Sequence, residues 1–373
     1  MNIRQLKTAI AKFKNADVSI IKDDAMRAKA KKLQAKQKGF TLLELLVVIT
    51  LLATLSTAAL VAYDGAGENA RDASAAAAVN TLEGTLRNYR SIVGEYPEQF
   101  DNLTNADGLL LDGDGNHVGA MQLMSDETKK FFGQLTIAAA QADAPTGVNK
   151  AIFASLREAG LEELQSVQSK TTWNDDYIPN LAMNESYGEV SLNPGSEIEF
   201  TDGGGVTFAE KTMSINTFSN IALSIVPSGG NGTNGCIIEG GSSLAAAFDS
   251  TVTIVENKAL NLISDGLSSE GCDLVVAVGI GKEVPGATLG EAVEIGQVPT
   301  VGTNDVNPKT HYARAIALFQ VASDNRDEDA DGGLGKIEED EVLEKARLIA
   351  VVDPEGRTID QITAEATAES DDD

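Results

Sequence analysis

The most constraining feature of the sequence is an apolar run at residues 40–63, in which Glu44 is the only charged residue. As a helix these 24 residues would be about 36 Å long, enough to cross the roughly 30 Å hydrocarbon core of a bilayer. A helix that is apolar on every side must be buried in lipid or in other protein. We therefore expect a membrane-spanning or core helix, in which a carboxylate is costly and indicates a function.

Charge divides the chain at this run. Residues 1–39 carry eleven Lys/Arg and three Asp/Glu, whereas the remainder carries 18 basic and 53 acidic residues. The positive-inside rule then places the N-terminus in the cytoplasm and the acidic body on the other side of the membrane. Such an acidic body would repel phosphates, so we expect no nucleic-acid partner. The basic segment 1–39, called the leader below, is amphipathic. This pattern fits binding to an anionic membrane surface, and it equally fits a solvated leader with no separate role.

The start of the apolar run resembles a known processing signal. The sequence Gly-Phe-Thr-Leu-Leu-Glu at 39–44, preceded by Lys36 and Lys38, resembles the cleavage and methylation motif of type IV pilins and type II secretion pseudopilins. The resemblance implies that a prepilin peptidase cuts after Gly39, removes the leader 1–39 and methylates the new amine of Phe40.

The same resemblance implies how subunits assemble. Glu44 would pair with the N-terminal amine of a neighbouring subunit in a filament core, where a buried charge needs a partner. The implied partners are the prepilin peptidase, further pilin or pseudopilin subunits of the same polymer, and an inner-membrane assembly platform. The implied location is the inner membrane as a single-pass protein before assembly, and a periplasmic or cell-surface filament afterwards.

The helix is expected to continue beyond the apolar run. The glycines at 65 and 67 weaken it, but apolar residues then recur at steps of three and four on one face. These residues are Ala75, Val79, Leu82, Leu86, Tyr89 and Val93. Gly94 and Pro97 end the pattern. Residues 64–97 are therefore interpreted as the amphipathic half of one long helix over 40–93, packed on a sheet.

Residues 98–170 are interpreted as an insertion of helices and loops, with helices at 125–140 and 149–168. Asp112, Asp114 and Asn116 alternate with glycines, which predicts a second metal loop or an exposed acidic turn. His117 stands where an EF-hand loop needs glycine, so the match is partial.

Residues 171–361 are predicted to form a β-rich head, and 362–373 a disordered acidic tail. The expected strands are 197–201, 220–226, 251–255, 273–279, 312–321 and 346–352. Cys236 and Cys272 are the only cysteines, and in an exported body they are expected to form a disulfide rather than two buried thiols. Glycines at 279 and 281 predict a turn, since no Gly-Lys-Ser/Thr sequence follows them.

The acidic loop at 327–338 fits the pattern D-x-D-x-D-G-x5-E. Its expected calcium ligands are Asp327, Asp329, Asp331, Gly333 through its carbonyl, and Glu338. The preceding run predicts a strand, so an EF-hand fold is not expected. The alternative is a solvated acidic hairpin loop.

These features predict an α+β protein, with a long N-terminal helix packed on an antiparallel β-sheet head. The predicted function is a structural filament subunit and not an enzyme, because no nucleophile elbow, HExxH or CxxC occurs. The alternative function is that of a minor subunit with a large adhesive or sensing head. A membrane-tethered enzyme is the weakest of the three hypotheses. Only two histidines are present, His117 and His311.

Overall fold

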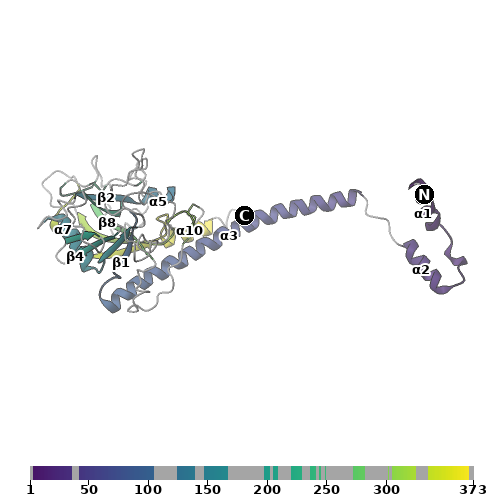
Figure 1. Ribbon diagram of the computed structural model, residues 1–373, viewed down its shortest axis with the longest axis horizontal. Coiled ribbons are helices and arrows are strands. Elements are labelled where there is room, and N and C mark those ends of the chain that lie inside the picture. Colours follow the sequence, from purple (N-terminus) through teal and green to yellow (C-terminus); the bar gives the residue numbers. More distant parts are fainter. Residues whose placement is uncertain are drawn as a thin grey trace. The chain divides into compact units, whose positions relative to one another are not determined.

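The structure is a computed structural model that forms two compact units, 1–65 and 66–373, whose boundary falls within one helix. It describes residues 3–35, 42–104, 124–138, 147–166, 197–201, 205–208, 220–228, 236–240, 243–244, 248, 272–281, 301, 305–324 and 335–368. Helices and strands are labelled in Figure 1.

The first unit contains the leader helices and the beginning of the long helix. α1 is Ile3–Lys14, η1 is Val18–Ile20, α2 is Asp24–Ala35, and α3 begins at Leu42. The side-chain amide of Gln34 in α2 donates hydrogen bonds to the carbonyls of Phe13 and Ala16, each at 2.8 Å. These two bonds connect α2 to the end of α1 and the residues just after it.

The long helix α3 runs without interruption from Leu42 to Val93, 52 residues. A helical glycine costs only about 1 kcal/mol, so the glycines at 65 and 67 do not break it. The predicted stripe is buried from Ala75 through Leu86. Val93 at its end is exposed, contrary to the predicted stripe, because the helix stops at Gly94, whose φ of 96° favours glycine.

The second unit contains a nine-stranded sheet and a separate two-stranded sheet. The strands are β1 Gln99–Asn102, β2 Gly133–Ala138, β3 Glu163–Ser166, β4 Glu197–Thr201, β5 Gly205–Phe208, β6 Asn220–Val226, β7 Ile237–Ile238, β8 Cys272–Gly279, β9 Ile316–Asp324, β10 Lys336–Ile337 and β11 Val342–Val352. The helices that accompany them are α5 Asp126–Phe131, α7 Val148–Glu158, η5 Glu339–Glu341 and α10 Ile359–Ala368.

The large sheet is organised around β8. Its strand order is β11-β9-β8-β1-β3-β4-β5, and β6 also pairs with β8 while β2 pairs with β6. On one side, β9 pairs with β8 over its whole length. On the other side, Val275 and Val276 pair with β6, whereas Val278 and Gly279 pair with β1. The sheet therefore branches along β8, and every residue of this strand is buried.

Each face of β8 contributes to a different core. Leu274, Val276 and Val278 belong to the larger core, together with the buried residues of α3 and α7. Val275 and Ala277 face a smaller core that contains Phe132 and Tyr312. This burial on both sides explains the continuous apolar sequence of β8, which does not alternate as a half-exposed strand would.

The structure confirms the α+β class but corrects the expected antiparallel sheet, which is mixed. Most neighbours are antiparallel, yet β1 and β3 pair in parallel. Parallel strands need a long crossover connection, and here the connection contains β2 and α7.

Residues 98–170 were expected to be helices and loops, and this expectation is wrong for β1, β2 and β3. The predicted helix 125–140 is a short helix, α5, followed by β2. The predicted helix 149–168 ends with α7 at Glu158 and is followed by β3. In β2 the buried Leu135 and Ile137 alternate with polar Gln134 and Thr136, which is a strand pattern.

The end of the described chain also differs from the prediction. Residues 362–368 were expected to be disordered, but they belong to helix α10, where Ile362 is fully buried against the larger core. One buried isoleucine and the polar contacts of Glu365 hold a segment whose composition predicts disorder. The strands expected at 197–201, 220–226, 273–279 and 346–352 are present, and the strand expected at 312–321 is displaced to 316–324. The segment 251–255 lies outside the described residues.

Candidate functional site

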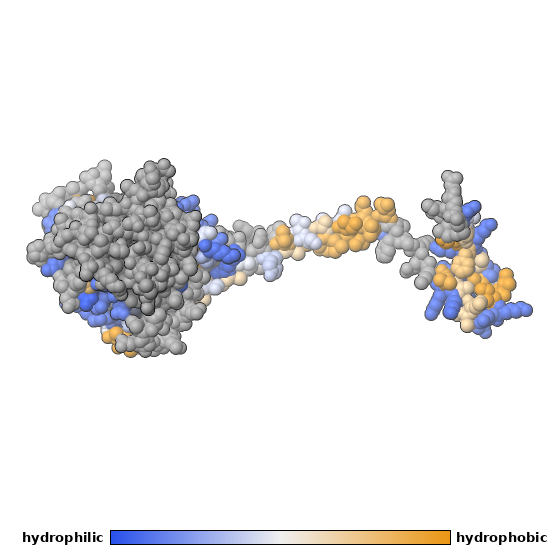
Figure 2. Space-filling view, viewed as in Figure 1, coloured by the Kyte–Doolittle hydropathy of each residue, from blue (hydrophilic) through white to orange (hydrophobic). Residues whose placement is uncertain are grey.

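The apolar half of α3 is the first functional element. Among the described helices, Leu42–Leu60 is the one segment long and apolar enough to cross a membrane by length and composition, and none of its residues is buried. Figure 2 shows mostly hydrophobic, orange atoms along this part of α3, with paler patches between them. None of the described residues buries these side chains, so they need lipid or other protein around them.

Glu44 lies in the first turn of α3, where it is exposed and acidic among apolar neighbours. The unsatisfied N–H groups of a helix N-terminus favour a negative charge at this place. Gly39 and Phe40, the predicted cleavage and methylation residues, lie outside the described residues.

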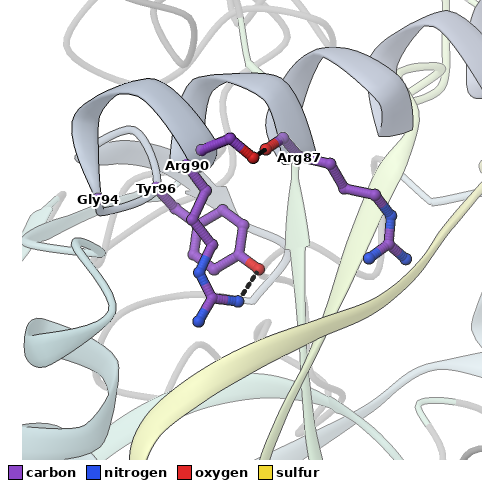
Figure 3. A pocket seen from close by; sticks show the side chains of 5 residues that line it. Arg87, Arg90, Gly94 and Tyr96 are labelled. Atoms are coloured by element: carbon purple, nitrogen blue, oxygen red, sulfur yellow. Dashed lines mark hydrogen bonds between the residues drawn. The ribbon is translucent and has the colours of Figure 1, made fainter.

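The opposite end of α3 forms a pocket of about 370 Å³, lined by Arg87, Arg90, Ser91, Gly94 and Tyr96. We call it the Arg90 pocket (Figure 3). The Nη1 of Arg90 donates to the hydroxyl of Tyr96 at 2.7 Å, and its guanidinium carbon lies 4.9 Å from the centre of the Tyr96 ring. Tyr96 is itself held in place, since its hydroxyl also accepts from the backbone N–H of Leu348 in β11 at 3.2 Å.

The two arginines of this pocket have different partners. Arg87 donates to the carboxylate of Glu83, one turn earlier on α3, at 3.0 and 2.7 Å. In contrast, the contacts of Arg90 are those with Tyr96, and within the described part of the chain no carboxylate lies within ion-pair distance of it. Figure 3 shows both guanidinium groups extending from the same side of the helix.

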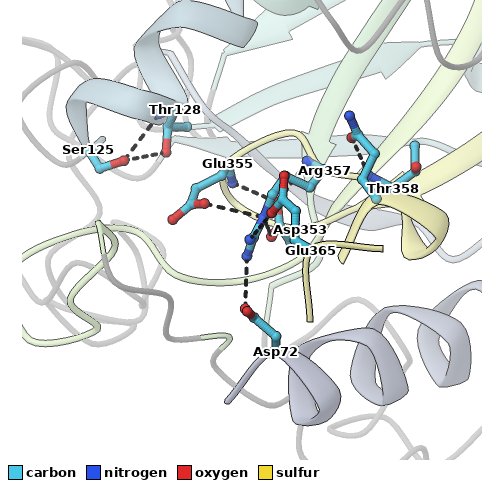
Figure 4. A network of polar contacts seen from close by, with 9 residues as sticks. Asp72, Ser125, Thr128, Asp353, Glu355, Arg357, Thr358 and Glu365 are labelled. Atoms are coloured by element: carbon cyan, nitrogen blue, oxygen red, sulfur yellow. Dashed lines mark hydrogen bonds and ion pairs between the residues drawn. The ribbon is translucent and has the colours of Figure 1, made fainter. Parts of the chain in front are cut away.

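A second charged cluster surrounds Arg357, just after β11 (Figure 4). Its guanidinium group contacts Asp353 at 2.8 Å, Glu355 at 3.3 Å and Glu365 at 2.8 Å. It also reaches Asp72 on α3 at 3.4 Å. One arginine thus connects the amphipathic half of α3, the turn after β11 and helix α10.

Burial changes the acid–base properties of this cluster. Burial raises the pKa of Glu355 to about 7; the positive charge of Arg357 opposes this rise, and the nearby Asp353 adds to it. Burial also raises the pKa of Asp353, against the effect of Arg357. Burial alone would lower the pKa of Arg357, but Asp353 and Glu355 raise it.

Only one of the five predicted calcium ligands, Glu338, belongs to the described residues. It directly precedes η5, its carboxylate accepts from the ammonium of Lys336, and its backbone N–H donates to Glu341 at 2.8 Å. The Glu338 carboxylate is thus already paired with Lys336, and the prediction that it binds calcium stays a prediction. No group of three or more metal-ligating side chains occurs among the described residues. Asp327, Asp329, Asp331 and Gly333 lie outside them, as do Asp112, Asp114 and Asn116.

The predicted disulfide is present. Cys236 and Cys272 are joined, with their Cα atoms 5.5 Å apart, and both residues are fully buried. The bond links the start of β8 to the residue before β7. Gly279 is the last residue of β8, and Gly281 lies two residues after it.

Sequence reasoning missed the Arg90 pocket and the Arg357 cluster. Two arginines three residues apart in so acidic a chain were one available signal for the pocket. For the cluster, the sequence Asp-Pro-Glu-Gly-Arg at 353–357, which places two acids next to an arginine, was the available signal. Neither pattern reveals that α3, β11 and α10 meet in space, because those contacts join residues more than 200 positions apart.

Comparison with known proteins gives one finding. Residues 34–60 match the family model of the prokaryotic N-terminal methylation motif, which is consistent with the resemblance to type IV pilins and pseudopilins. No curated protein and no solved structure matches the chain. The matched residues include the end of the leader, the segment 39–44 and the apolar half of α3.

Proposed function

We propose that this chain is the precursor of a structural filament subunit of the type IV pilin or type II secretion pseudopilin kind. The observation that carries the proposal is the methylation motif at 34–60, joined to an apolar helix that none of the described residues covers. Before assembly the apolar half of α3 holds the subunit in the inner membrane. After assembly the same surface is covered by the corresponding helices of other subunits.

Three partners follow from this function. The prepilin peptidase cuts between Gly39 and Phe40 and methylates Phe40. The assembly platform in the inner membrane receives the processed subunit, and further copies surround its helix. Glu44 then neutralises the amine of a neighbouring Phe40, because an unpaired charge in an apolar filament core is strongly destabilising. No catalytic role is assigned to the head.

The proposal includes calcium binding by the loop that connects β9 and β10. The ligands are Asp327, Asp329, Asp331, Gly333 and Glu338, and the support is their spacing together with the position of Glu338 directly before η5. The loop at 112–116 is the second candidate.

The experiment that tests the function is N-terminal analysis of the native protein by mass spectrometry. The mature chain should begin at Phe40 and carry one methyl group on its amine. Gly39→Leu should block cleavage and leave the leader attached, whereas Gln37→Ala, a control two residues earlier, should be processed normally. Surface-exposed protein that retains residues 1–39 in the unaltered chain would overturn the proposal.

A further inference from the structure

Large apolar side chains are exposed throughout the described part of the leader. In α1, Ile10 and Phe13 are exposed over 49% and 44% of their surface. The other exposed apolar residues, in η1 and α2, are Ile20, Met26 and Leu33. Figure 2 shows orange and blue atoms side by side on this part of the chain. Apolar surface in contact with water is unfavourable, so these side chains favour a partner that covers them.

The apolar positions of α1 share one face of the helix. They recur at steps of three, four and three, at Ile3, Leu6, Ile10 and Phe13. The helix contains no acidic residue, and Lys12 and Lys14 lie in its last turn. A helix with one apolar face and lysines on the rest of its surface lies in the plane of a membrane interface, where the lysine stems extend toward the headgroups.

The three acidic residues of the leader are engaged within it. Asp17 and Asp23 each accept a hydrogen bond from the backbone N–H two residues further on, at 2.9 Å. Asp24 pairs with Arg27 at 2.8 Å. In contrast, five exposed lysines of α1 and α2 make no ion pair within the described part of the chain, namely Lys12, Lys14, Lys29, Lys31 and Lys32. The leader therefore offers a partner positive charge next to apolar surface.

The covalent connection to α3 indicates which partner is within reach. Seven residue steps from Ala35 at the end of α2 to Leu42 at the start of α3 span at most about 25 Å. The leader thus stays close to the membrane surface at which the apolar half of α3 begins. By the positive-inside rule this surface is cytoplasmic, and its anionic lipids attract basic segments. An anionic bilayer surface supplies both the negative charge and the apolar environment that the leader lacks.

We propose that the leader binds the anionic cytoplasmic face of the membrane, with the apolar face of α1 between the lipid chains and the lysines of α1 and α2 at the headgroups. Stable binding at a membrane surface takes two signals, and the leader combines an amphipathic helix with a polybasic one. The inference rests on the proposed function for the side of the membrane, and it gives a role to a segment that the proposed function only removes. Cleavage after Gly39 ends the contact, so the contact belongs to the precursor.

Fluorescence quenching of the full-length precursor in vesicles tests the contact directly. A bimane label is attached at Ile10→Cys or at Thr8→Cys, which lies about 160° away around the helix axis. Cys236 and Cys272 do not take the label, because they are joined to each other. The vesicles contain either equal parts of phosphatidylglycerol and phosphatidylethanolamine, or phosphatidylcholine alone, and the leader faces outward.

In the anionic vesicles, a quencher on the lipid chains should reach the label at Ile10→Cys, and iodide in the water should reach the label at Thr8→Cys. In phosphatidylcholine the ratio of lipid-protected to iodide-accessible label at Ile10→Cys should fall about tenfold or more. A label equally open to iodide in both kinds of vesicle would mean a solvated leader and overturn the proposal. Protection that requires added prepilin peptidase would overturn it too, in favour of a protein partner.

Charge reversal in α1 tests the electrostatic part of the contact. Lys12→Glu with Lys14→Glu should lower the protected ratio of the label at Ile10→Cys about tenfold or more in anionic vesicles, because attraction to the headgroups becomes repulsion. Lys309→Glu with Lys345→Glu is the matched control, since it makes the same change of charge at exposed residues of the head and should have no effect. Equal protection in both double variants would contradict the proposal.

Replacement of Phe13 tests the apolar part. Phe13→Ser should lower the protected ratio of the same label, whereas Phe13→Leu should keep it, because leucine restores an apolar side chain to the same face of α1. The backbone carbonyl that accepts from Gln34 is present in both variants, so the connection between α1 and α2 is not removed. A Phe13→Ser chain as well protected as the Phe13→Leu chain would show that the apolar face does not enter the bilayer.

The two proposals fail in distinguishable ways. If the native protein is not cut at Phe40, the filament function fails, and the label in the vesicles still decides whether the leader binds lipid. If the native protein is cut and methylated at Phe40 but the label at Ile10→Cys stays open to iodide in anionic vesicles, only the inference about the leader fails.

Discussion

At the scale of single residues, burial raises the pKa of three acids in the head, Asp273, Asp353 and Glu355. Glu355 is the clearest case, because it is buried beside Asp353 and Arg357 and its pKa is raised to about 7. An acid whose pKa is higher in the folded state binds protons more tightly there than in the unfolded chain. Its contribution to stability is therefore full below about pH 4.5 and is lost as the pH rises through about 7.

We predict that Glu355→Gln stabilises the head above pH 7 and not near pH 4.5. The amide never ionises, so the mutant avoids the cost of a buried charge; a shift of one pKa unit corresponds to about 1.4 kcal/mol. We expect a gain of about 1 kcal/mol or more at pH 8, measured by thermal unfolding at pH 5 and pH 8. Glu365→Gln is the control, since Glu365 binds the same arginine from an exposed position. If the stability of Glu355→Gln falls between pH 5 and pH 8 by as much as that of the unaltered protein, the prediction is wrong.

Gly279 is a position where the close approach of another side chain requires glycine. A Cβ atom there would lie 1.9 Å from the hydroxyl oxygen of Tyr312, which donates to Asp101 at 2.7 Å in a buried position. We predict that Gly279→Ala lowers the free energy of unfolding by about 2–4 kcal/mol, through overpacking and loss of the buried hydrogen bond. Gly84→Ala on α3 meets no atom within 4 Å and should be neutral or slightly stabilising. Chemical denaturation of the two variants makes the comparison, and equal stabilities would refute it.

At the scale of elements, the sequence predicted long and strongly periodic segments well. The continuous helix α3 and the strand β8 follow from apolar patterns that their own residues carry. The short elements were harder. The strand pattern of β2 covers only four residues, and its pairing partner, β6, lies far along the chain. The parallel pairing of β1 with β3 is likewise set by the crossover between them and not by either strand.

Within α3, Glu44 is predicted to act in assembly and not in the fold of the head. Glu44→Ala should be inserted and processed normally, but filament yield should fall about tenfold or more, since a buried amine would lose its partner. Thr50→Ala is the control, because the Thr50 hydroxyl already donates to the carbonyl of Val47 in its own helix at 2.9 Å. Sheared filaments are quantified alongside the N-terminal mass. Normal assembly of the Glu44→Ala chain would exclude this role.

The acidic loop before η5 gives a prediction about metal. Calcium should raise the melting temperature of the purified protein relative to a chelator, because a ligand that binds the folded state stabilises it. Asp329→Ala combined with Asp331→Ala should abolish the difference, whereas Asp112→Ala with Asp114→Ala should leave it unchanged. Magnesium should substitute poorly, since the pattern supplies more oxygens than its octahedral shell uses. If the first double mutant keeps its response to calcium, the ion binds elsewhere.

At the scale of the whole molecule, the disulfide constrains the part of the head that contains β8. Cys236 and Cys272 are 36 residues apart, and closing a loop of this length restricts the unfolded chain by about 3–4 kcal/mol. We predict that the double variant Cys236→Ser with Cys272→Ser loses about this much stability, measured by denaturant unfolding. Reductant should destabilise the unaltered protein and have no effect on the double variant. An unaltered protein insensitive to reductant would contradict this account.

The branching of the sheet at β8 also fixes an order in time. At about 5–20 residues per second, the ribosome synthesises β8 about 10–40 s after the apolar part of α3 has been made. Until then β1 and β6 lack the strand that both of them pair with, so the sheet cannot close. In a filament precursor of the proposed kind, the apolar part of α3 would reach the bilayer while the strands that pair with β8 are still unpaired. For a head that is exported, as the proposed function requires, the late synthesis of β8 would delay closure of the sheet until after the membrane segment is made.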